Sequence, residues 1–162
     1  MIAYIGFFLI LLAFLNALIL ISSKPLLSKV MPDYGSVILS SSKLLFPLIL
    51  FSFISLIISF LTNDFSLKYV SSNSNSLLPY YYKISATWAG HEGSMLLWCL
   101  VLSFWTFMAS VYSKDLDTDF RLKFLSIMGL LNIGFLAFLI FTSNPFEKNL
   151  SIPIDGRDLN PF

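Results

Sequence analysis

Four long stretches without a charged residue constrain this chain more than any other feature of its sequence. Crossing a bilayer core of about 30 Å takes roughly 17–25 mostly apolar helical residues. Four runs have that length, at 2–21, 44–61, 94–111 and 124–142. Because lipid cannot pair with backbone N–H and C=O groups, each run is expected to be helical. Residues 1–162 are therefore predicted to form one all-α integral membrane domain with about four transmembrane helices.

The composition supports this class. Hydrophobic residues make up 57% of the chain and charged residues only 12%, against about 25% charged residues in a typical soluble domain. The net charge of +1 gives no indication of a nucleic-acid partner. The single cysteine, Cys99, cannot form an internal disulfide and is interpreted as a small buried hydrophobe. Asn16 and Asn132 are the strongest polar residues within the runs, and each is expected to form a hydrogen bond across a helix interface.

The distribution of Lys and Arg predicts the orientation. The connections after the first and third runs hold more positive charge per residue than residues 63–93 or the tail, so they are expected to face the cytoplasm or matrix. The N-terminus, residues 63–93 and the tail then lie outside. The basic residues counted are Lys24, Lys29, Lys43, Lys114, Arg121 and Lys123 on the inner side, and Lys68, Lys83, Lys148 and Arg157 on the outer side. No basic segment precedes the first run, so it is interpreted as a retained helix and not as a signal peptide.

The connection between the second and third runs contains three kinds of sequence. Residues 63–70 are expected to be a short strand or an interfacial segment, and 71–76 a low-complexity linker. Residues 77–88 carry three tyrosines and a tryptophan, which favour the headgroup level of a membrane. They are predicted to form a short interfacial segment before the third helix.

The only histidine, His91, lies beside Glu92 and between Gly90 and Gly93. The pair could be a base with its orienting carboxylate, or a metal or haem ligand with a supporting acid. The alternative is structural: the glycines permit a turn, Ser94 caps the third helix, and Glu92 complements the helix dipole. A metal site normally needs three or four ligands, and no second histidine exists. Spacing alone therefore favours the structural interpretation, with no metal site and no catalytic residue assigned.

Two further groups have the same two interpretations. Trp88, Trp98 and Trp105 could present a flat aromatic surface to a porphyrin, or pack against lipid and neighbouring helices. Asp155, Arg157 and Asp158 in the polar tail could bind a partner or a haem propionate, or form a solvated turn with a weak local ion pair. Spacing alone favours the structural interpretation of both groups.

An ordered set of short motifs resembles the N-terminal part of the CcmF family of cytochrome c-type biogenesis proteins, with the NrfE proteins as close relatives. The resemblance covers nearly the whole chain. The motifs are Asn63-Asp64-Phe65, Tyr69-Val70, Ser72-Asn73-Ser74-Asn75, Leu78-Pro79, Ala86-Thr87-Trp88, His91-Glu92-Gly93-Ser94, Leu96-Leu97-Trp98, Thr142-Ser143-Asn144-Pro145-Phe146 and Asp155-Gly156-Arg157-Asp158-Leu159-Asn160-Pro161.

This resemblance implies a haem lyase of the cytochrome c maturation system. Such a protein accepts haem from a haem chaperone and attaches it to apocytochrome c on the outer face of the membrane. Haem is then a cofactor or substrate of the assembly, together with other maturation subunits. The implied location is the bacterial inner (cytoplasmic) membrane or the mitochondrial inner membrane.

The chain is much shorter than the members of this family. Their tryptophan-rich segment and haem-ligand histidines lie downstream of the matched region, and His91 corresponds to none of those ligands. The chain is therefore not expected to act alone as a lyase. It is expected to lack the C-terminal lyase portion, either as a split-gene N-terminal subunit or as a piece of a longer protein. The alternative is a structural membrane subunit that scaffolds a separate catalytic subunit without touching haem.

Within this family interpretation, the outer surface is expected to position haem or a partner without making bonds. A rigid glycine turn, a hydrogen bond between the imidazole and the acid, and aromatic walls would do so. The residues assigned to this surface are Trp88, Gly90, His91, Glu92, Gly93, Trp98, Asp155, Arg157 and Asp158. An unrelated small transporter is disfavoured because no charged residue lies within the four runs.

Overall fold

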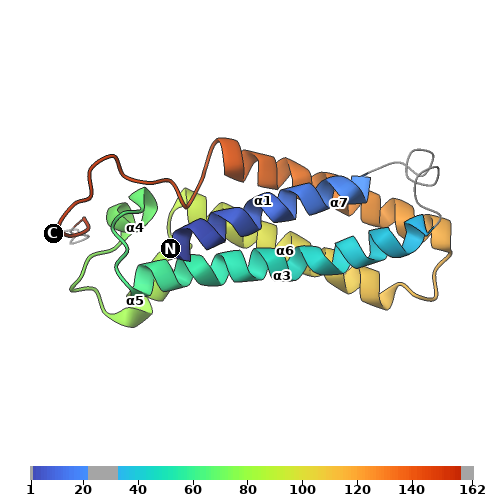
Figure 1. Cartoon of the computed structure of the whole chain (residues 1–162). Coiled ribbons are helices and arrows are strands. Elements are labelled where there is room, and N and C mark those ends of the chain that lie inside the picture. Colours follow the sequence, from blue (N-terminus) through green and yellow to red (C-terminus); the bar gives the residue numbers. More distant parts are fainter. Residues whose placement is uncertain (1, 22–32, 158–162) are drawn as a thin grey trace.

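A computed structural model describes residues 2–21 and 33–157. Four long helices lie side by side along one axis: α1 (Ile2–Ile21), α3 (Tyr34–Leu61), α6 (His91–Tyr112) and α7 (Thr118–Phe141) (Figure 1). Two short helices, α4 (Lys68–Asn73) and α5 (Tyr80–Ala86), lie at one end of the bundle. Lys24 and Lys29, which were counted for the orientation, and Asp158, which was assigned to the outer surface, lie outside the described residues.

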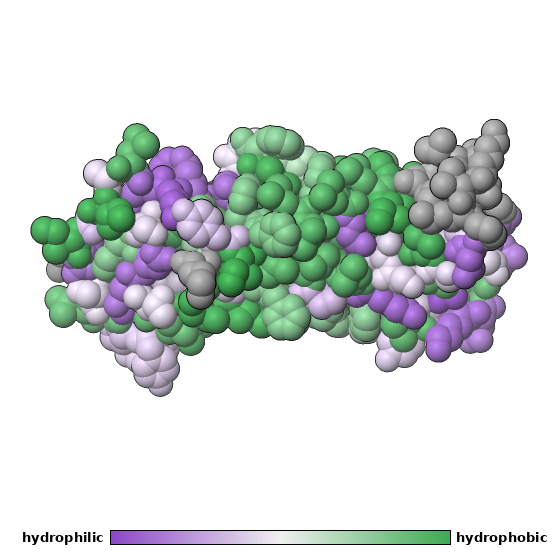
Figure 2. Space-filling model, in the orientation of Figure 1, coloured by the Kyte–Doolittle hydropathy of each residue, from purple (hydrophilic) through white to green (hydrophobic). Residues whose placement is uncertain are grey.

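The four long helices are each long and apolar enough to cross a membrane, which confirms the predicted fold class. A broad apolar band covers the middle of the molecule, and polar residues gather at its two ends (Figure 2). Large side chains such as Phe8, Trp105 and Phe141 are exposed within the helices. In water these side chains would be unfavourable, whereas lipid accommodates them.

Three helices begin earlier than their apolar runs. Tyr34 starts α3 ten positions before the predicted residue 44, so Lys43 lies on an exposed helical turn and not in a loop. Thr118 starts α7 six positions before residue 124, where the Asp117 side chain accepts a hydrogen bond of 3.1 Å from the Phe120 amide. A helix gains one hydrogen bond for each added residue, so it continues past the bilayer until a cap or a breaker ends it.

The most extensive contacts join α1 to α3, α3 to α6, α6 to α7 and α7 to α1, so the four long helices form a ring in that order, and α3 also contacts α7 across it. Small side chains line the contacts. Ser52 on α3 donates a hydrogen bond of 2.9 Å to the Gly6 carbonyl of α1. A Cβ atom on Gly129 of α7 would lie 2.5 Å from the Leu20 Cβ atom of α1. Small residues let membrane helices approach closely where no hydrophobic effect drives them together.

Both predicted asparagine bonds are confirmed. Asn16 Nδ2 donates to the Ser41 carbonyl across the α1–α3 contact at 2.8 Å. Asn132 Nδ2 donates to Thr106 Oγ1 across the α6–α7 contact at 3.0 Å. Polar side chains placed between helices thus join the ring at two separate points.

The expectations for residues 63–76 were partly wrong. The strand is reduced to one isolated antiparallel bridge between Leu67 and Lys148, and residues 68–73 form α4. Two polar side chains of the expected linker form hydrogen bonds within this helix. Ser72 Oγ donates a hydrogen bond of 2.9 Å to the Lys68 carbonyl, and Asn73 Nδ2 donates one of 2.9 Å to the Tyr69 carbonyl. Tyr69 and Val70 are buried, and this tertiary packing overrides the low helix propensity of Ser and Asn.

Candidate functional site

The candidate site lies at one end of the bundle, in a region here called the end cap (residues 63–94, which include the first turn of α6, and 143–157). The N-terminus of α1 lies at the same end (Figure 1). Lys148 Nζ donates a hydrogen bond of 2.6 Å to Tyr4 Oη and lies 3.8 Å from the centre of its ring. The tail is thereby fastened to α1, and all the site residues predicted from the sequence that the structure describes belong to the end cap, except Trp98 in α6.

Tyr69 is the central residue of the end cap. Its hydroxyl donates to the Thr87 carbonyl at 3.1 Å and accepts from the Gly90 amide at 3.0 Å. Its ring packs edge-on against Phe60, with 5.4 Å between the centroids. Burial raises the pKa of Tyr69 above its usual value, and the negative charge of Glu92 adds to that effect. The hydroxyl therefore stays neutral and can donate and accept together.

Gly90 and Gly93 are required by space and not by backbone conformation. Neither has a positive φ angle, and Gly90 has extended backbone angles (φ −98°, ψ 174°). A Cβ atom on Gly90 would lie 2.6 Å from the Tyr69 ring. A Cβ atom on Gly93 would overlap the Thr87 carbonyl oxygen. The predicted turn is present at Gly90, and Gly93 follows within the first turn of α6; Tyr69 and Thr87 fill the space that a side chain at either position would need.

His91 is the first residue of α6, and its partner is not the one expected. Its Nδ1 lies 2.6 Å from Ser143 Oγ, just beyond the end of α7, and not against Glu92. Consecutive residues at a helix start point about 100° apart, which separates the imidazole from the neighbouring carboxylate. Gly90, and not Ser94, occupies the cap position, while Ser94 Oγ donates 2.7 Å to the Trp88 carbonyl. The imidazole therefore ties the start of α6 to the end of α7.

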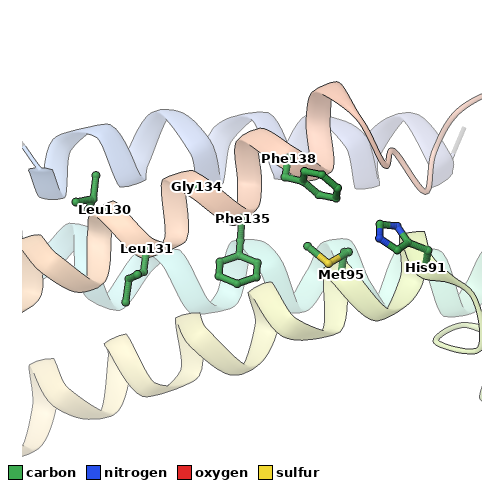
Figure 3. Close-up of a pocket in the computed structure, with 7 residues that line it drawn as sticks. All are labelled: His91, Met95, Leu130, Leu131, Gly134, Phe135 and Phe138. Atoms are coloured by element: carbon green, nitrogen blue, oxygen red, sulfur yellow. The ribbon is translucent and has the colours of Figure 1, made fainter.

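An apolar groove of about 440 Å³ runs between α6 and α7, and His91 lies at one end of it (Figure 3). His91 is its only titratable lining residue, and its ring packs edge-on against Phe138 at 5.7 Å. Leu130 is 60% exposed, so the groove opens to the outside of the ring of helices. The lining residues are His91, Met95, Leu130, Leu131, Gly134, Phe135 and Phe138.

The residues present do not form a two-ligand haem site or a metal site. His91 and Met95 supply the nitrogen and sulfur donors of the groove, but they lie one turn apart on one face of α6. They could not grip a porphyrin from opposite sides. Among the described residues, no three His, Cys, Asp or Glu side chains are grouped as a metal site requires. The groove suits an apolar group or side chain, with one imidazole at its end.

The predicted aromatic wall is not assembled around His91. Trp98 and Trp105 are both 59% exposed on α6, and neither lines the groove. Trp88 is 40% exposed at the end of the cap, where its carbonyl accepts the bond from Ser94. The three tryptophans therefore face outward, as residues in contact with lipid or another protein would.

Asp155 and Arg157 attach the tail to residues 71–76 through hydrogen bonds. Asp155 Oδ1 accepts a hydrogen bond of 2.9 Å from the Ser76 amide, and its Oδ2 accepts one of 2.5 Å from the Ser76 hydroxyl. These bonds hold the pKa of the Asp155 carboxyl below its usual range. The Arg157 amide donates 2.7 Å to the Ser71 carbonyl. Asp158, the third predicted member, lies outside the described residues.

Three residues of the end cap were not assigned to the site from the sequence. They are Tyr69, Ser143 and Lys83, whose buried ammonium donates 2.7 Å to Asn63 Oδ1 and 3.3 Å to the Ser76 carbonyl. Each has a partner that is distant in sequence or lies in an irregular segment, so no periodic spacing reveals it. Asn63 itself has a positive φ of 53°, a conformation that asparagine adopts more readily than most residues.

Comparisons with known proteins agree with the motifs. The family described as "Cytochrome C assembly protein" matches residues 88–162. The cytochrome c-type biogenesis protein CcmF of Pseudomonas fluorescens is 54% identical over 118 residues, which cover 72% of this chain and 18% of that protein. CcmF of Escherichia coli K12 is 48% identical over 120 residues, which cover 74% of this chain and 18% of that protein. NrfE of Haemophilus influenzae is 46% identical over 104 residues, which cover 64% of this chain and 16% of that protein.

The fold matches a solved structure described as "Cytochrome c Heme Lyase CcmF", with a TM-score of 0.79 and 27% identity. The match covers 91% of this chain and 25% of that one. The chain thus spans about 18% of the length of these two CcmF proteins. The chain belongs to the family of the cytochrome c-type biogenesis proteins CcmF and NrfE, and it corresponds to the N-terminal part of that family.

Proposed function

We propose that this chain is the N-terminal part of a cytochrome c haem lyase, which accepts haem from a haem chaperone and attaches it to apocytochrome c. The observation that carries the proposal is the match of 91% of the chain to the structure of a cytochrome c haem lyase. The chain contributes the end cap on the outer face of the membrane. Because His91 and Met95 cannot coordinate the haem iron from opposite sides of the porphyrin, the axial ligands of haem come from the remainder of the lyase.

The role proposed for the end cap is positioning. Tyr69 fixes Gly90 and Thr87, and His91 is fixed to Ser143 at 2.6 Å. The ends of α6 and α7 are thus held together beside the groove. Side chains held in this way lose little freedom when a partner binds, which favours binding.

The multi-pass chain is proposed to lie in the cytoplasmic membrane of a bacterium, with the end cap outside. The relatives named above are bacterial, which favours this membrane over the mitochondrial inner membrane. The basic residues that the structure describes at the opposite end, Lys43, Lys114, Arg121 and Lys123, agree with an inner location for that end.

A His91→Ala variant in the intact maturation system tests the positioning role. Covalently bound haem in cytochrome c is measured together with the level of the variant protein in the membrane. We expect the yield of holocytochrome c to fall several-fold at an unchanged protein level. Ser113→Ala, at the opposite end of the bundle, is the control and should leave the yield unchanged. A normal yield for His91→Ala would reduce this histidine to a structural role.

The second candidate is a structural subunit that holds a separate catalytic subunit without contact to haem or apocytochrome. The outward-facing Trp98 and Trp105, each 59% exposed, suit such a contact. Cross-links separate the two functions. A photoreactive group at Trp88 should reach the haem chaperone or apocytochrome under the first proposal, and only lyase peptides under the second.

A further inference from the structure

Residues 150–154, here called the arch, connect two firmly held points of the tail. The first point lies just before it. The Lys68 amide donates 2.9 Å to the Glu147 carbonyl, and the Asn149 amide donates 2.9 Å to the Ser66 carbonyl. The Asn149 side chain adds hydrogen bonds to the Phe65 carbonyl and to Ser71 Oγ. The tail is therefore joined to the start of α4 by backbone and side-chain bonds.

The second point lies just after the arch. Asp155 holds the amide and hydroxyl of Ser76, and the Arg157 amide is bonded to the Ser71 carbonyl. Gly156 lies so close to the Ser74 carbonyl that a Cβ atom would overlap it. Both ends of the arch are thus attached to the segment around α4, and the five residues between them are constrained.

The arch presents apolar side chains that are largely exposed within the described part of the chain. Leu150 is 110% exposed, Ile152 69% and Ile154 103%. The segment carries no charge, and Pro153 has no backbone N–H. Within the described part of the chain, no backbone amide of residues 150–154 donates a hydrogen bond to another residue. Leu77, next to the bonded Ser76, is 91% exposed and extends this apolar surface.

We do not assign the membrane as the binding partner of the arch. It belongs to the end cap, where isolated apolar side chains stand among polar ones, outside the continuous apolar band of the helices (Figure 2). Two basic side chains adjoin the arch: Lys148 is engaged with Tyr4, and the exposed Arg157 follows three positions after Ile154. The arch itself carries no charge, so it gains nothing from the negative charge of lipid headgroups. A protein surface is the better occupant.

We propose that the arch and Leu77 dock onto the part of the haem lyase that this chain does not cover. The inference rests on the proposed function. Relatives carry 82% of their length outside the matched region, since the match covers 18% of them. Permanent interfaces are more apolar than transient ones, which resemble the rest of the surface. An uncharged, pre-ordered set of Leu and Ile side chains therefore fits a permanent contact within the lyase better than a passing substrate.

Site-specific photo-cross-linking tests this docking surface in the protein as its cells produce it. A photoreactive phenylalanine analogue replaces Ile152 or Ile154 in separate variants, and adducts are mapped by mass spectrometry after irradiation of intact membranes. We expect adducts with peptides of the lyase outside residues 1–162. The same analogue at Leu116, 51% exposed at the other end of the bundle, is the matched control and should not give those peptides.

A second variant ties the adducts to the apolar side chains. With the probe at Ile152, the double substitution Leu150→Ser and Ile154→Ser should lower the adduct yield at least tenfold at an unchanged level of membrane protein. Adducts only with lipid, with a second copy of this chain, with apocytochrome or with the haem chaperone would overturn the proposal. An unchanged yield in the double variant would overturn it as well.

Holocytochrome c is measured in the same cells to keep the two proposals apart. Missing lyase adducts together with a normal holocytochrome yield would refute the docking surface and leave the proposed function intact. Lyase adducts that persist in cells unable to make haem would support docking independently of haem chemistry.

Discussion

The Tyr69 hydroxyl accepts a hydrogen bond of 3.0 Å from the Gly90 amide, 21 positions further along the chain. The same hydroxyl donates to the Thr87 carbonyl at 3.1 Å. One buried side chain therefore fixes the turn that introduces α6. The position of His91, the next residue after Gly90, depends on a helix that the sequence alone did not reveal.

Tyr69→Phe should destabilise the end cap. The change removes one hydroxyl and leaves the partly buried Gly90 amide without its acceptor. A fully buried donor left unpaired typically costs about 1–3 kcal/mol, which is the upper range for this loss. The free energy of unfolding of the purified protein in mixed micelles measures the effect. Tyr82→Phe removes a hydroxyl from a ring that is 54% exposed and should change this free energy by much less. Equal effects of the two variants would contradict the central role of Tyr69.

Gly93→Ala should destabilise the protein although alanine is the better helix former. Its Cβ atom would overlap the Thr87 carbonyl oxygen, a backbone atom that cannot simply rotate away. Forced overpacking of this kind costs about 1–3 kcal/mol. Gly134→Ala is the matched control in α7, because its Cβ atom would meet nothing within 4 Å. That variant should be neutral or more stable by up to about 1 kcal/mol. The reverse order of stabilities would rule out the steric explanation.

Thr106→Val should weaken the contact between α6 and α7. Valine keeps the shape of the side chain but cannot accept the hydrogen bond of 3.0 Å from Asn132 Nδ2. Hydrogen bonds between membrane helices contribute about 0.6 kcal/mol on average and at most about 1.7 kcal/mol. Unfolding in mixed micelles should show a loss in this range. Ser126→Ala, whose hydroxyl bonds only to the Leu122 carbonyl of its own helix, should cost less.

Acid should release the tail at Asp155. Hydrogen bonds from Ser76 hold the pKa of this carboxyl below its usual value, so the stabilisation is present above the unfolded pKa of about 3.9. It is lost as the pH falls through the lower folded pKa. The amide resonances of Ser76 and Gly156 should shift together in that range. In Asp155→Ala the tail should be released at every pH, and the acid transition should disappear from the Ser76 amide. A persistent transition would assign it to another group.

The sequence predicted what depends on periodicity and length, and it missed what depends on contacts between distant segments. Four uncharged runs predicted four helices, because lipid leaves no alternative for their backbone. Three of their starts were placed too late; α3, for example, already begins at Tyr34. Residues 71–76 were interpreted as a linker, although burial of Tyr69 and Val70 makes residues 71–73 part of α4.

In the candidate site, too, the sequence predicted local features and missed contacts between distant segments. Gly90 and Gly93 were predicted to form a rigid turn; Gly90 lies in such a turn, whereas Gly93 lies in the first turn of α6. The expected bond from His91 to Glu92 was wrong, since its partner Ser143 is 52 positions away and becomes a neighbour only when α6 and α7 pair. No local pattern contains that information. The outward direction of Trp98 also follows from helix packing and not from spacing.

The bond between His91 and Ser143 can be separated from a direct role of the imidazole. If Ser143 acts by holding His91, Ser143→Ala should lower the holocytochrome c yield as His91→Ala does. The double variant should then be no worse than either single variant, because both remove the same interaction. Ser85→Ala, an exposed serine of the same end cap, is the control. Losses that multiply in the double variant would mean that the two residues act independently, whereas a loss confined to His91→Ala would mean that the imidazole acts without its serine partner.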